Sequence, residues 1–476
     1  MKQIPLFGSE TKGLSQFLSS QRRVNCYYEL IPSGEKDANV VIRGTPGYFQ
    51  FTQLPSTPIK GGIVVNQTLY VVAGMSLYSV NQAGVSTLLG VMSNITNNIV
   101  ALASNGLQIL ISTGSLGYTY TIATNTLAQI TSGGYPQSTA SNCFLNGFFI
   151  VNNPGTSQFY ISDVYDGTTW EALQFASAEV IPDNLLAVSA LHNNLILWGA
   201  NHIEFWTDTG GAPFPFSQQV GTAQNYGLAA VNSIAQFNNT MCFLGENVQG
   251  QVQVMMLAGY TPHPISDNGI NHIINDFAIT SDAIAFGYMV DGHPMYQITF
   301  PTAQRSFLYE GTNGLWSEVQ SGVADTGRHN ANLCIPYNGQ VYITDTSSGN
   351  LYQFDTDVYT DNGATIKREI DTRHVSQDGN RFTIGELWFD FQLGQGLQTG
   401  QGSNPQIMLQ TSRDNGETFG NERWAPIGKV GQYLGPRCVF RRLGQARDFV
   451  FRIRLTDPVP FVLIRGSAVL QPSTET

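Results

Sequence analysis

A dense group of arginines near the C-terminal end is the part of the sequence best suited to binding an anionic partner. Its six members are Arg437, Arg441, Arg442, Arg447, Arg452 and Arg454. A guanidinium group binds a carboxylate or a phosphate through two parallel hydrogen bonds. Within residues 437–454 only Asp448 carries a negative charge. We predict a partner interface with an acidic protein surface; the alternatives are contact with DNA phosphate and a solvated outer face of a sheet.

Paired carboxylates for glycoside hydrolysis are the second candidate chemistry, because two acids about 5 to 10 Å apart are enough for it. The acids considered are Asp163, Asp166 and Glu171, or Glu204 with Asp208. We interpret them as solvated loop carboxylates, since nothing in the sequence brings two of them together. The histidines His263, His272 and His293 lack metal-ligand spacing, and the chain has no nucleophile elbow or P-loop. The sequence therefore predicts no enzyme, no catalytic residue, no metal site and no cofactor.

The segment Ser412–Phe419 fits the S-x-D-x-G-x-T-[WF] Asp-box of sialidase propellers. In those folds the motif is a hairpin turn remote from the active site. A sialidase also needs several arginines to bind the substrate carboxylate. The stretch 61–304 has no arginine at all, so we predict that the motif is a structural turn.

Tight turns flanked by alternating apolar residues recur along most of the chain. The strands that such turns join are the elements that must position the candidate side chains. The turns are Asn66-Gln67, Asn105-Gly106, Asn146-Gly147, Asn193-Asn194, Asn238-Asn239, Asp291-Gly292 and Asn338-Gly339. They are 39, 41, 47, 45, 53 and 47 residues apart. Asn, Asp and Gly suit two-residue hairpin turns, which require a positive φ. The repeat predicts a β architecture.

Each turn joins two strand-like runs, a third run follows, and a further short run opens each unit, such as Tyr48–Gln53 or Leu315–Val319. Four antiparallel strands every 45 residues or so are typical of propeller blades, because such a sheet buries its faces only between like neighbours. The seven turns predict seven blades. The alternatives are a ring of six blades and a large β-sandwich.

The repeat ends after Asp361-Asn362-Gly363, where strands lengthen and arginine becomes common. We therefore predict an all-β protein with a β-propeller and a C-terminal β-sandwich-like domain. The expected domains are an N-terminal arm and extended segment at 1–47, the propeller at 48–364 and the sandwich-like domain at 365–476. The strands expected in the last domain are Phe382–Leu393, Gln406–Thr411, Val439–Leu443, Phe449–Leu455 and Phe461–Leu470.

Charge is distributed unevenly along the 476 residues, whose net charge is −11. Residues 61–304 carry twelve acidic and no basic side chains, whereas both ends of the chain are basic. Such a chain repels nucleic acid and anionic membranes. The five cysteines are far apart and odd in number, which argues against a disulfide framework. We find no signal peptide and no membrane span in the sequence.

Two segments resemble a known family. The run Arg23–Glu29, followed by Arg43-Gly44-Thr45-Pro46-Gly47-Tyr48, resembles the opening of the tail hub proteins of short-tailed bacteriophages, also called nozzle or packaged-DNA stabilisation proteins. The segment Phe440–Arg447, continued through Asp457-Pro458-Val459-Pro460, is similar to the closing part of that family. Chain length and domain order match as well.

The resemblance implies a structural component of the virion tail, assembled in the host cytoplasm. It implies a homohexameric ring that forms a channel below the portal and the head-to-tail adaptor. Such a ring would retain packaged DNA, bind tail fibres or spikes and a channel plug or needle, and conduct DNA during ejection. A wall formed by the acidic stretch would let DNA pass without tight binding. The alternative function is that of a carbohydrate-binding or carbohydrate-cleaving propeller.

Overall fold

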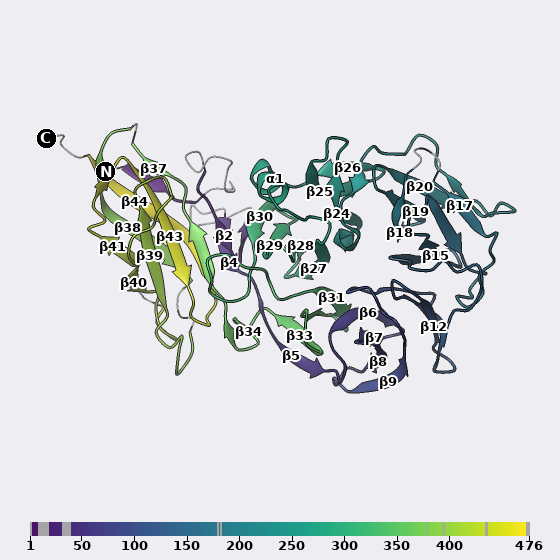
Figure 1. Cartoon of the computed structure of the whole chain (residues 1–476). Helices are drawn as coiled ribbons and strands as arrows, with labels where there is room; N and C mark the ends of the chain where they lie inside the picture. Colours follow the sequence, from purple (N-terminus) through teal and green to yellow (C-terminus); the bar gives the residue numbers. More distant parts are fainter. Residues whose placement is uncertain are drawn as a thin grey trace.

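The computed structural model describes residues 2–7, 19–30, 40–178, 180, 183–377, 379–392, 394, 396–433 and 437–472. A ring of β-sheets occupies one side of the molecule and a β-sandwich the other, and the first and last strands, β1 and β44, both belong to the sandwich (Figure 1). Residues 8–18, most of the polar N-terminal arm, fall outside the described residues. No helix in the described part of the chain is long and apolar enough to cross a membrane.

The sheets of the ring follow one another along the chain as antiparallel meanders. The first two are β6 (Ile59–Val65), β7 (Thr68–Ala73), β8 (Ser76–Val80) and β9 (Ser86–Val91), then β10 (Ala101–Ser104), β11 (Gln108–Ser112), β12 (Gly117–Thr121) and β13 (Thr126–Gln129). The next two are β14 (Asn142–Leu145), β15 (Phe148–Asn152), β16 (Gln158–Ile161) and β17 (Phe175–Ser177), then β18 (Leu185–Leu191), β19 (Asn194–Gly199), β20 (Ile203–Asp208) and β21 (Phe216–Gln218).

The remaining ring sheets differ in detail. One contains β22 (Gly227–Leu228), β23 (Ala235–Phe237), β24 (Thr240–Glu246), β25 (Val252–Ala258) and β26 (Thr261–Pro264), and is followed by helix α1 (Asn268–Asn275). The next is β27 (Ile284–Val290), β28 (His293–Phe300), β29 (Arg305–Glu310) and β30 (Leu315–Glu318). The last is β31 (Leu333–Tyr337), β32 (Gln340–Thr344), β33 (Asn350–Asp355) and β5 (Gly47–Gln53), extended by β34 (Thr360–Asp361) and β35 (Ala364–Thr365).

Strand β5 closes the ring, because it comes from the N-terminal part of the chain but completes the last sheet by pairing with β33. β31 of that sheet contacts β6 of the first. Residues of both sheets, among them Leu69 and Tyr342, form one buried apolar cluster. We expected the short runs to open their units, but β5 and β30 are each the fourth strand of a meander and so complete a sheet.

Each predicted turn joins two consecutive strands of one sheet; the fifth, for example, joins β23 and β24. Asn146 and Gly147 have φ values of 49° and 95°, as a two-residue turn requires. The fourth turn lies one residue earlier than expected. Asn194 already pairs with Leu191, so His192, with φ 53°, takes the left-handed position.

Two sheets form the sandwich. One contains β3 (Cys26–Leu30), β4 (Val40–Gly44), β44 (Val462–Pro472), β38 (Phe382–Phe391) and β41 (Cys438–Arg441), with β1 (Lys2–Pro5) and β42 (Gln445–Ala446) at its sides. The other contains β2 (Arg23–Val24), β36 (Arg368–Asp371), β43 (Asp448–Leu455), β39 (Gln406–Ser412) and β40 (Arg423–Pro426), with β37 (Val375–Ser376) beside β43. The N-terminal segment is therefore built into the sandwich.

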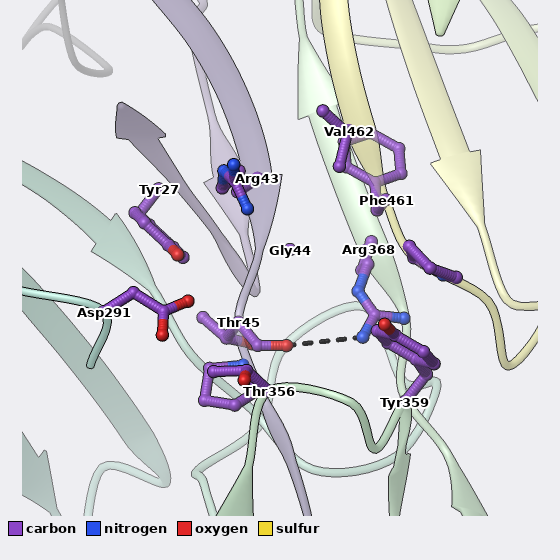
Figure 2. Close-up of a pocket in the computed structure, with 12 residues that line it drawn as sticks. Tyr27, Arg43, Gly44, Thr45, Asp291, Thr356, Tyr359, Arg368, Phe461 and Val462 are labelled. Carbon is purple, nitrogen blue, oxygen red and sulfur yellow. Dashed lines mark hydrogen bonds between the residues drawn. The ribbon is translucent and has the colours of Figure 1, made fainter. Parts of the chain in front are cut away.

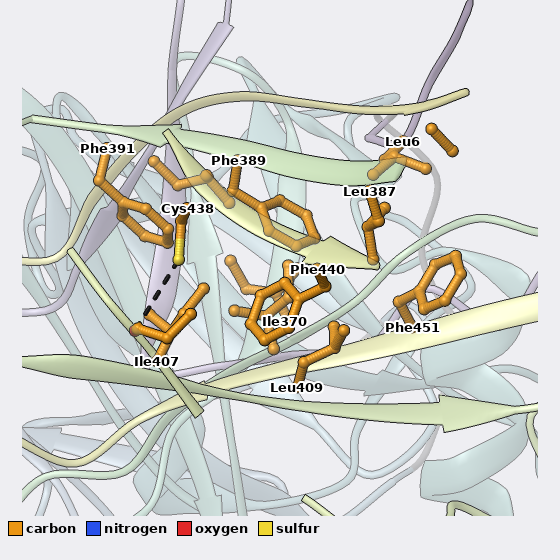
Figure 3. Close-up of a cluster of buried hydrophobic side chains, with 14 of the residues drawn as sticks. Leu6, Ile370, Leu387, Phe389, Phe391, Ile407, Leu409, Cys438, Phe440 and Phe451 are labelled. Atoms are coloured by element: carbon orange, nitrogen blue, oxygen red, sulfur yellow. Dashed lines mark hydrogen bonds between the residues drawn. The ribbon is translucent and has the colours of Figure 1, made fainter. Parts of the chain in front are cut away.

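The sandwich core lies between these two sheets (Figure 3). Phe389 and Phe440 come from the first sheet, Leu409 and Ile370 from the second, and all four are buried. Burial of one such side chain contributes about 1.5–3 kcal/mol. Leu6 joins this core, so the described start of the chain is held by packing as well as by the pairing of β1 with β44.

Candidate functional site

Two of the predicted interface arginines, Arg452 and Arg454, lie at the junction between the propeller and the sandwich. In the register of β36 with β43, Asp371 lies opposite Arg452, and Glu369 lies opposite Arg454. Arg452 Nε donates to Asp371 Oδ1 at 2.8 Å, and Arg454 Nη2 donates to Glu369 Oε2 at 2.6 Å. Cross-strand ion pairs of this kind stabilise a sheet. Both arginines therefore have partners within the chain.

Glu369 is the centre of a larger ionic network, defined here as the junction network. Its carboxylate is fully buried, and it also lies 3.1 Å from Arg22 Nη1 and 3.7 Å from Lys367 Nζ. Arg22 binds Glu318, at the end of β30, at 2.8 Å. Burial opposes the charge of Arg22, but the hydrogen bond to Glu318 and the neighbouring carboxylates outweigh it and raise its pKa above the usual value. The network thus joins the N-terminal segment, the propeller and the sandwich.

The backbone crosses the same junction. β2 pairs with β30 of the propeller in parallel and with β36 of the sandwich in antiparallel orientation, so one ten-stranded sheet runs through both parts. Asn25 follows β2 with φ 54°. Its Nδ2 donates to the carbonyls of Gln320 and Lys367, both at 2.9 Å, and its Oδ1 accepts from Gln320 N–H at 2.9 Å. One buried amide therefore holds three segments together.

The Gly-Thr-Pro-Gly turn lies beside this junction, in the pocket drawn in Figure 2. A Cβ atom on Gly44 would lie 2.2 Å from Arg368 Nε, and one on Gly47 would lie 2.4 Å from the Thr360 carbonyl oxygen. Neither position therefore has room for a side chain. Arg368 is buried and donates to the Thr45 carbonyl at 3.3 Å, the contact drawn as a dashed line in Figure 2. Burial lowers the pKa of its guanidinium.

The Asp-box segment is a turn between β39 and β40. Ser412 Oγ donates to Asp414 Oδ1 at 2.7 Å, and Thr418 N–H donates to the same oxygen at 3.0 Å. These hydrogen bonds lower the pKa of Asp414 to about 2. The carboxylate is thereby committed to shaping the turn, as the sequence predicted.

Of the acids considered for glycoside hydrolysis, Asp166 and Glu204 have side-chain hydrogen-bond partners within the chain, and Glu204, expected to be a solvated loop carboxylate, is instead buried in β20. Asp166 accepts hydrogen bonds from Thr168 and Thr169, which lower its pKa although its partial burial opposes this. Glu204 is buried and accepts from His202 at 3.0 Å and from Trp206 at 2.9 Å. Among the described residues, no group of three or more His, Cys, Asp or Glu side chains is arranged to hold a metal ion.

The other four arginines of the predicted interface lie on the surface of the sandwich. Arg437 pairs with Asp390 at 3.3 Å and lies over the Trp388 ring, with its Cζ 4.2 Å from the ring centroid. Arg447 donates to the Gly379 carbonyl at 2.8 Å. Arg441 and Arg442 are exposed near the end of β41. The structure thus divides the cluster between the junction network and the surface.

The acidic side chains of the junction network were not predicted from the sequence. Lys367, Glu369 and Asp371 alternate with Arg368 and Ile370, a period of two that would have placed the three charged side chains on one face of a strand. The pairing of that face with Arg22, more than 340 residues earlier in the chain, carries no local signal.

Comparison with known proteins finds two matching family models. One, described as bacteriophage P22 Gp10, beta-propeller, matches residues 2–359; the other, described as bacteriophage P22 Gp10, beta-sandwich, matches residues 367–471. They confirm the predicted order of a propeller followed by a sandwich. A curated relative, the tail hub protein gp10 of Salmonella phage P22, is 21% identical over 334 residues, which cover 67% of each chain.

Similar solved structures include the Pan2 WD40 domain of Neurospora crassa, which is 10% identical, covers 65% of this chain and 95% of its own, and has a TM-score of 0.43. A streptogramin B lyase structure is 12% identical, covers 70% of this chain and 98% of its own, and has a TM-score of 0.39. Both scores are too low to support an argument.

Proposed function

The chain belongs to the bacteriophage P22 Gp10 family, and from this premise we propose that it forms the ring-shaped channel of a phage tail. Family membership makes it a structural protein of the virion tail rather than an enzyme, since the P22 relative is a tail hub protein. The resemblance to tail hub proteins seen in the sequence is thereby confirmed. The match of both domains in the same order carries this proposal.

In the proposed assembly six copies form a ring below the portal and the head-to-tail adaptor. The ring retains packaged DNA, anchors tail fibres or spikes and a channel plug or needle, and conducts DNA during ejection. We keep the domain limits 1–47, 48–364 and 365–476 as part of this proposal. The N-terminal segment has a double role in it, because β3 and β4 complete the sandwich while β5 closes the propeller.

The way in which the two domains are joined supports a mechanical role, namely resistance to the pressure of packaged DNA. A channel that holds DNA under pressure needs subunits whose domains do not hinge. The ten-stranded sheet and the junction network connect the two parts of this chain through backbone hydrogen bonds and buried ion pairs. Domains joined only by a flexible linker would move independently.

The charge of the propeller supports conduction without tight binding. Residues 61–304 carry twelve acidic and no basic side chains. Each phosphate neutralised by Lys or Arg adds affinity and salt dependence, so a surface without these residues lets a polyanion slide past. We expect no measurable affinity of the purified protein for duplex DNA at physiological salt. Sub-micromolar, salt-sensitive binding would contradict the proposed conduit.

The decisive experiment is a phage in which the gene for this chain carries a nonsense mutation. Grown on a non-suppressing host, it should give heads that package DNA and then lose it, and that lack tail fibres or spikes. Electron microscopy and nuclease sensitivity of the packaged genome measure both effects. Particles that retain DNA and carry a complete tail without this chain would refute the proposal, and native mass spectrometry of the assembled ring tests the number of copies.

A further inference from the structure

Four exposed arginines meet at one edge of the sandwich, where β40 and β41 contact each other. Arg423 Nη1 donates to the Arg441 carbonyl at 2.9 Å, and Arg413 Nη2 donates to the Leu443 carbonyl at 2.9 Å. Arg442 lies between these two carbonyls in the sequence. A cleft opens between Arg413 and Arg423, with Leu443 among its lining residues. We call this site the arginine cleft.

The closing Arg-Arg-Leu-Gly motif of the sequence builds the arginine cleft. Leu443 is 2% exposed and anchors the turn in the sandwich core. Arg442 adopts φ 59°, which is uncommon for a residue with a side chain, and it remains exposed. A Cβ atom on Gly444 would lie 2.4 Å from Arg413 Nη2, so the glycine leaves room for that guanidinium.

Three of the four arginines at the arginine cleft have no carboxylate partner among the described residues. Arg441 pairs with Glu386 at 2.7 Å. Arg413, Arg423 and Arg442 form no ion pair with any residue that the structure describes. Arginine is always protonated in proteins, so these three groups carry a full charge at every physiological pH.

The acids nearest to the cleft already have partners. Asp414 lines it, but both of its carboxylate oxygens accept hydrogen bonds from the Asp-box turn, Oδ1 from Ser412 and Oδ2 from Thr418. Glu422 pairs with Arg454 at 3.2 Å. Because the donors to Asp414 are neutral, Asp414 keeps its negative charge, and the two arginines that line the cleft, Arg413 and Arg423, outnumber this one carboxylate.

The surroundings favour a protein partner over nucleic acid. The cleft is lined by arginine, which is enriched in protein interfaces, whereas lysine is depleted there. The site also contains no lysine.

We propose that the arginine cleft binds an acidic segment of another tail protein. Carboxylates of that segment pair with Arg413 and Arg423 in the cleft and with Arg442, the residue before the lining residue Leu443. This inference rests on the proposed tail function for the identity of the partner, but the recognition chemistry is independent of it. It replaces the wider arginine surface expected from the sequence, because Arg452 and Arg454 are engaged inside the chain.

The test uses the full chain and a fluorescein-labelled peptide of eight glutamates, followed by fluorescence anisotropy at low salt. The wild type should bind the peptide. The double variant Arg413→Gln with Arg423→Gln should bind at least about ten-fold more weakly, because two charge-assisted contacts are lost. Arg447→Gln is the matched control: it removes an equally exposed arginine outside the cleft and should leave binding unchanged.

Arg442→Glu is the second variant, because this side chain makes no hydrogen bond with a described residue and its loss leaves the fold intact. It should also bind the peptide at least about ten-fold more weakly. Absence of binding by the wild type, or equal loss in the Arg447→Gln control, would overturn the proposal. Binding of a 20-bp DNA duplex more tightly than the peptide, abolished in the double variant, would also overturn it and assign the cleft to nucleic acid.

The two proposals fail in different experiments. Particles that lack this chain yet retain their DNA would refute the channel function and leave peptide binding unaffected. Unchanged peptide binding in Arg442→Glu and in the double variant would refute the arginine cleft and leave the channel function standing.

Discussion

At the scale of single residues, Glu369 is the carboxylate that the charged side chains of the junction network share. It is completely buried and lies within 4 Å of four cationic side chains. These cations come from the N-terminal segment, β43 and the residue just before β36. Buried charges are tolerated because they are paired. Loss of the common carboxylate leaves the buried Lys367 without its carboxylate partner and removes one of the partners of each arginine.

We predict that Glu369→Gln lowers the free energy of unfolding by about 3–5 kcal/mol, measured by urea denaturation. Glu422→Gln is the matched control: Glu422 pairs with Arg454 near the surface, and its loss should cost less than about 1 kcal/mol. Equal effects of the two substitutions would show that the junction network contributes no more than a surface ion pair.

Asp361 gives the fold a dependence on pH. Burial raises its pKa from 3.8 to about 7, against the opposing hydrogen bond of Ser321 and the charge of Arg368. Between these two values the folded chain holds a proton that the unfolded chain has released. The stabilisation from this group is therefore present below about pH 4 and is lost as the pH rises to about 7.

The side chain of Asp361→Asn cannot titrate. The free energy of unfolding of this variant, relative to that of the wild type, should therefore rise by about 3 kcal/mol between about pH 5 and about pH 8. Thermal denaturation at both pH values measures this change. Asp357→Asn, at an exposed position in the same segment, should follow the wild-type pH profile. A constant difference between Asp361→Asn and wild type at the two pH values would contradict the buried, protonated carboxylate.

At the scale of elements, β5 depends on a glycine for its place in the last sheet. Gly47 N–H donates to the Val358 carbonyl at 2.7 Å, and β34 pairs with β5 on the side away from β33. The backbone of residues 358–360 therefore lies against Gly47, and it cannot move aside as a flexible side chain would.

We predict that Gly47→Ala destabilises the protein by about 1–3 kcal/mol or more, because its Cβ would lie 2.4 Å from the Thr360 carbonyl oxygen. Gly133→Ala is the control, since nothing lies within 4 Å of its Cβ position, and it should change stability by less than about 0.5 kcal/mol. Equal midpoints of urea unfolding for the two variants would show that β34 and β5 separate easily.

At the scale of the whole molecule, propeller and sandwich should unfold together. The ten-stranded sheet passes from β27 through β2 to β40 without a break, so separating the two parts breaks backbone pairing as well as side-chain contacts (Figure 1). We predict one calorimetric transition for the wild type, although chains of this size often show several.

Asn25→Gly should broaden that transition or divide it in two. Glycine keeps the positive φ of this position but removes the three hydrogen bonds that join β2 to the segments at Gln320 and Lys367. Two resolved transitions already in the wild type would contradict the mechanical coupling that the proposed channel requires.

The sequence by itself determined what depends on local chemistry. Asn, Asp and Gly at regular intervals indicated hairpin turns and hence a propeller. In the expected strand Phe449–Leu455, Phe451 and Ile453 alternate with arginines, a period of two that puts them on one face, and the structure buries both. The Asp-box turn was predictable for the same reason, since its hydrogen bonds join residues within a few positions of each other. The family motifs at both ends indicated the tail hub family.

Only the tertiary structure decided which distant segments meet. That β5 completes the last sheet and that β2 joins propeller to sandwich depends on pairing between residues roughly 300 positions apart, and strand pairing over such distances leaves no local pattern. The same reason explains why the partners of Arg452 and Arg454 could not be predicted. Their alternation fixed which face of β43 Arg452 and Arg454 occupy, but whether that face meets water or Glu369 was set by packing of the N-terminal segment and the propeller against it.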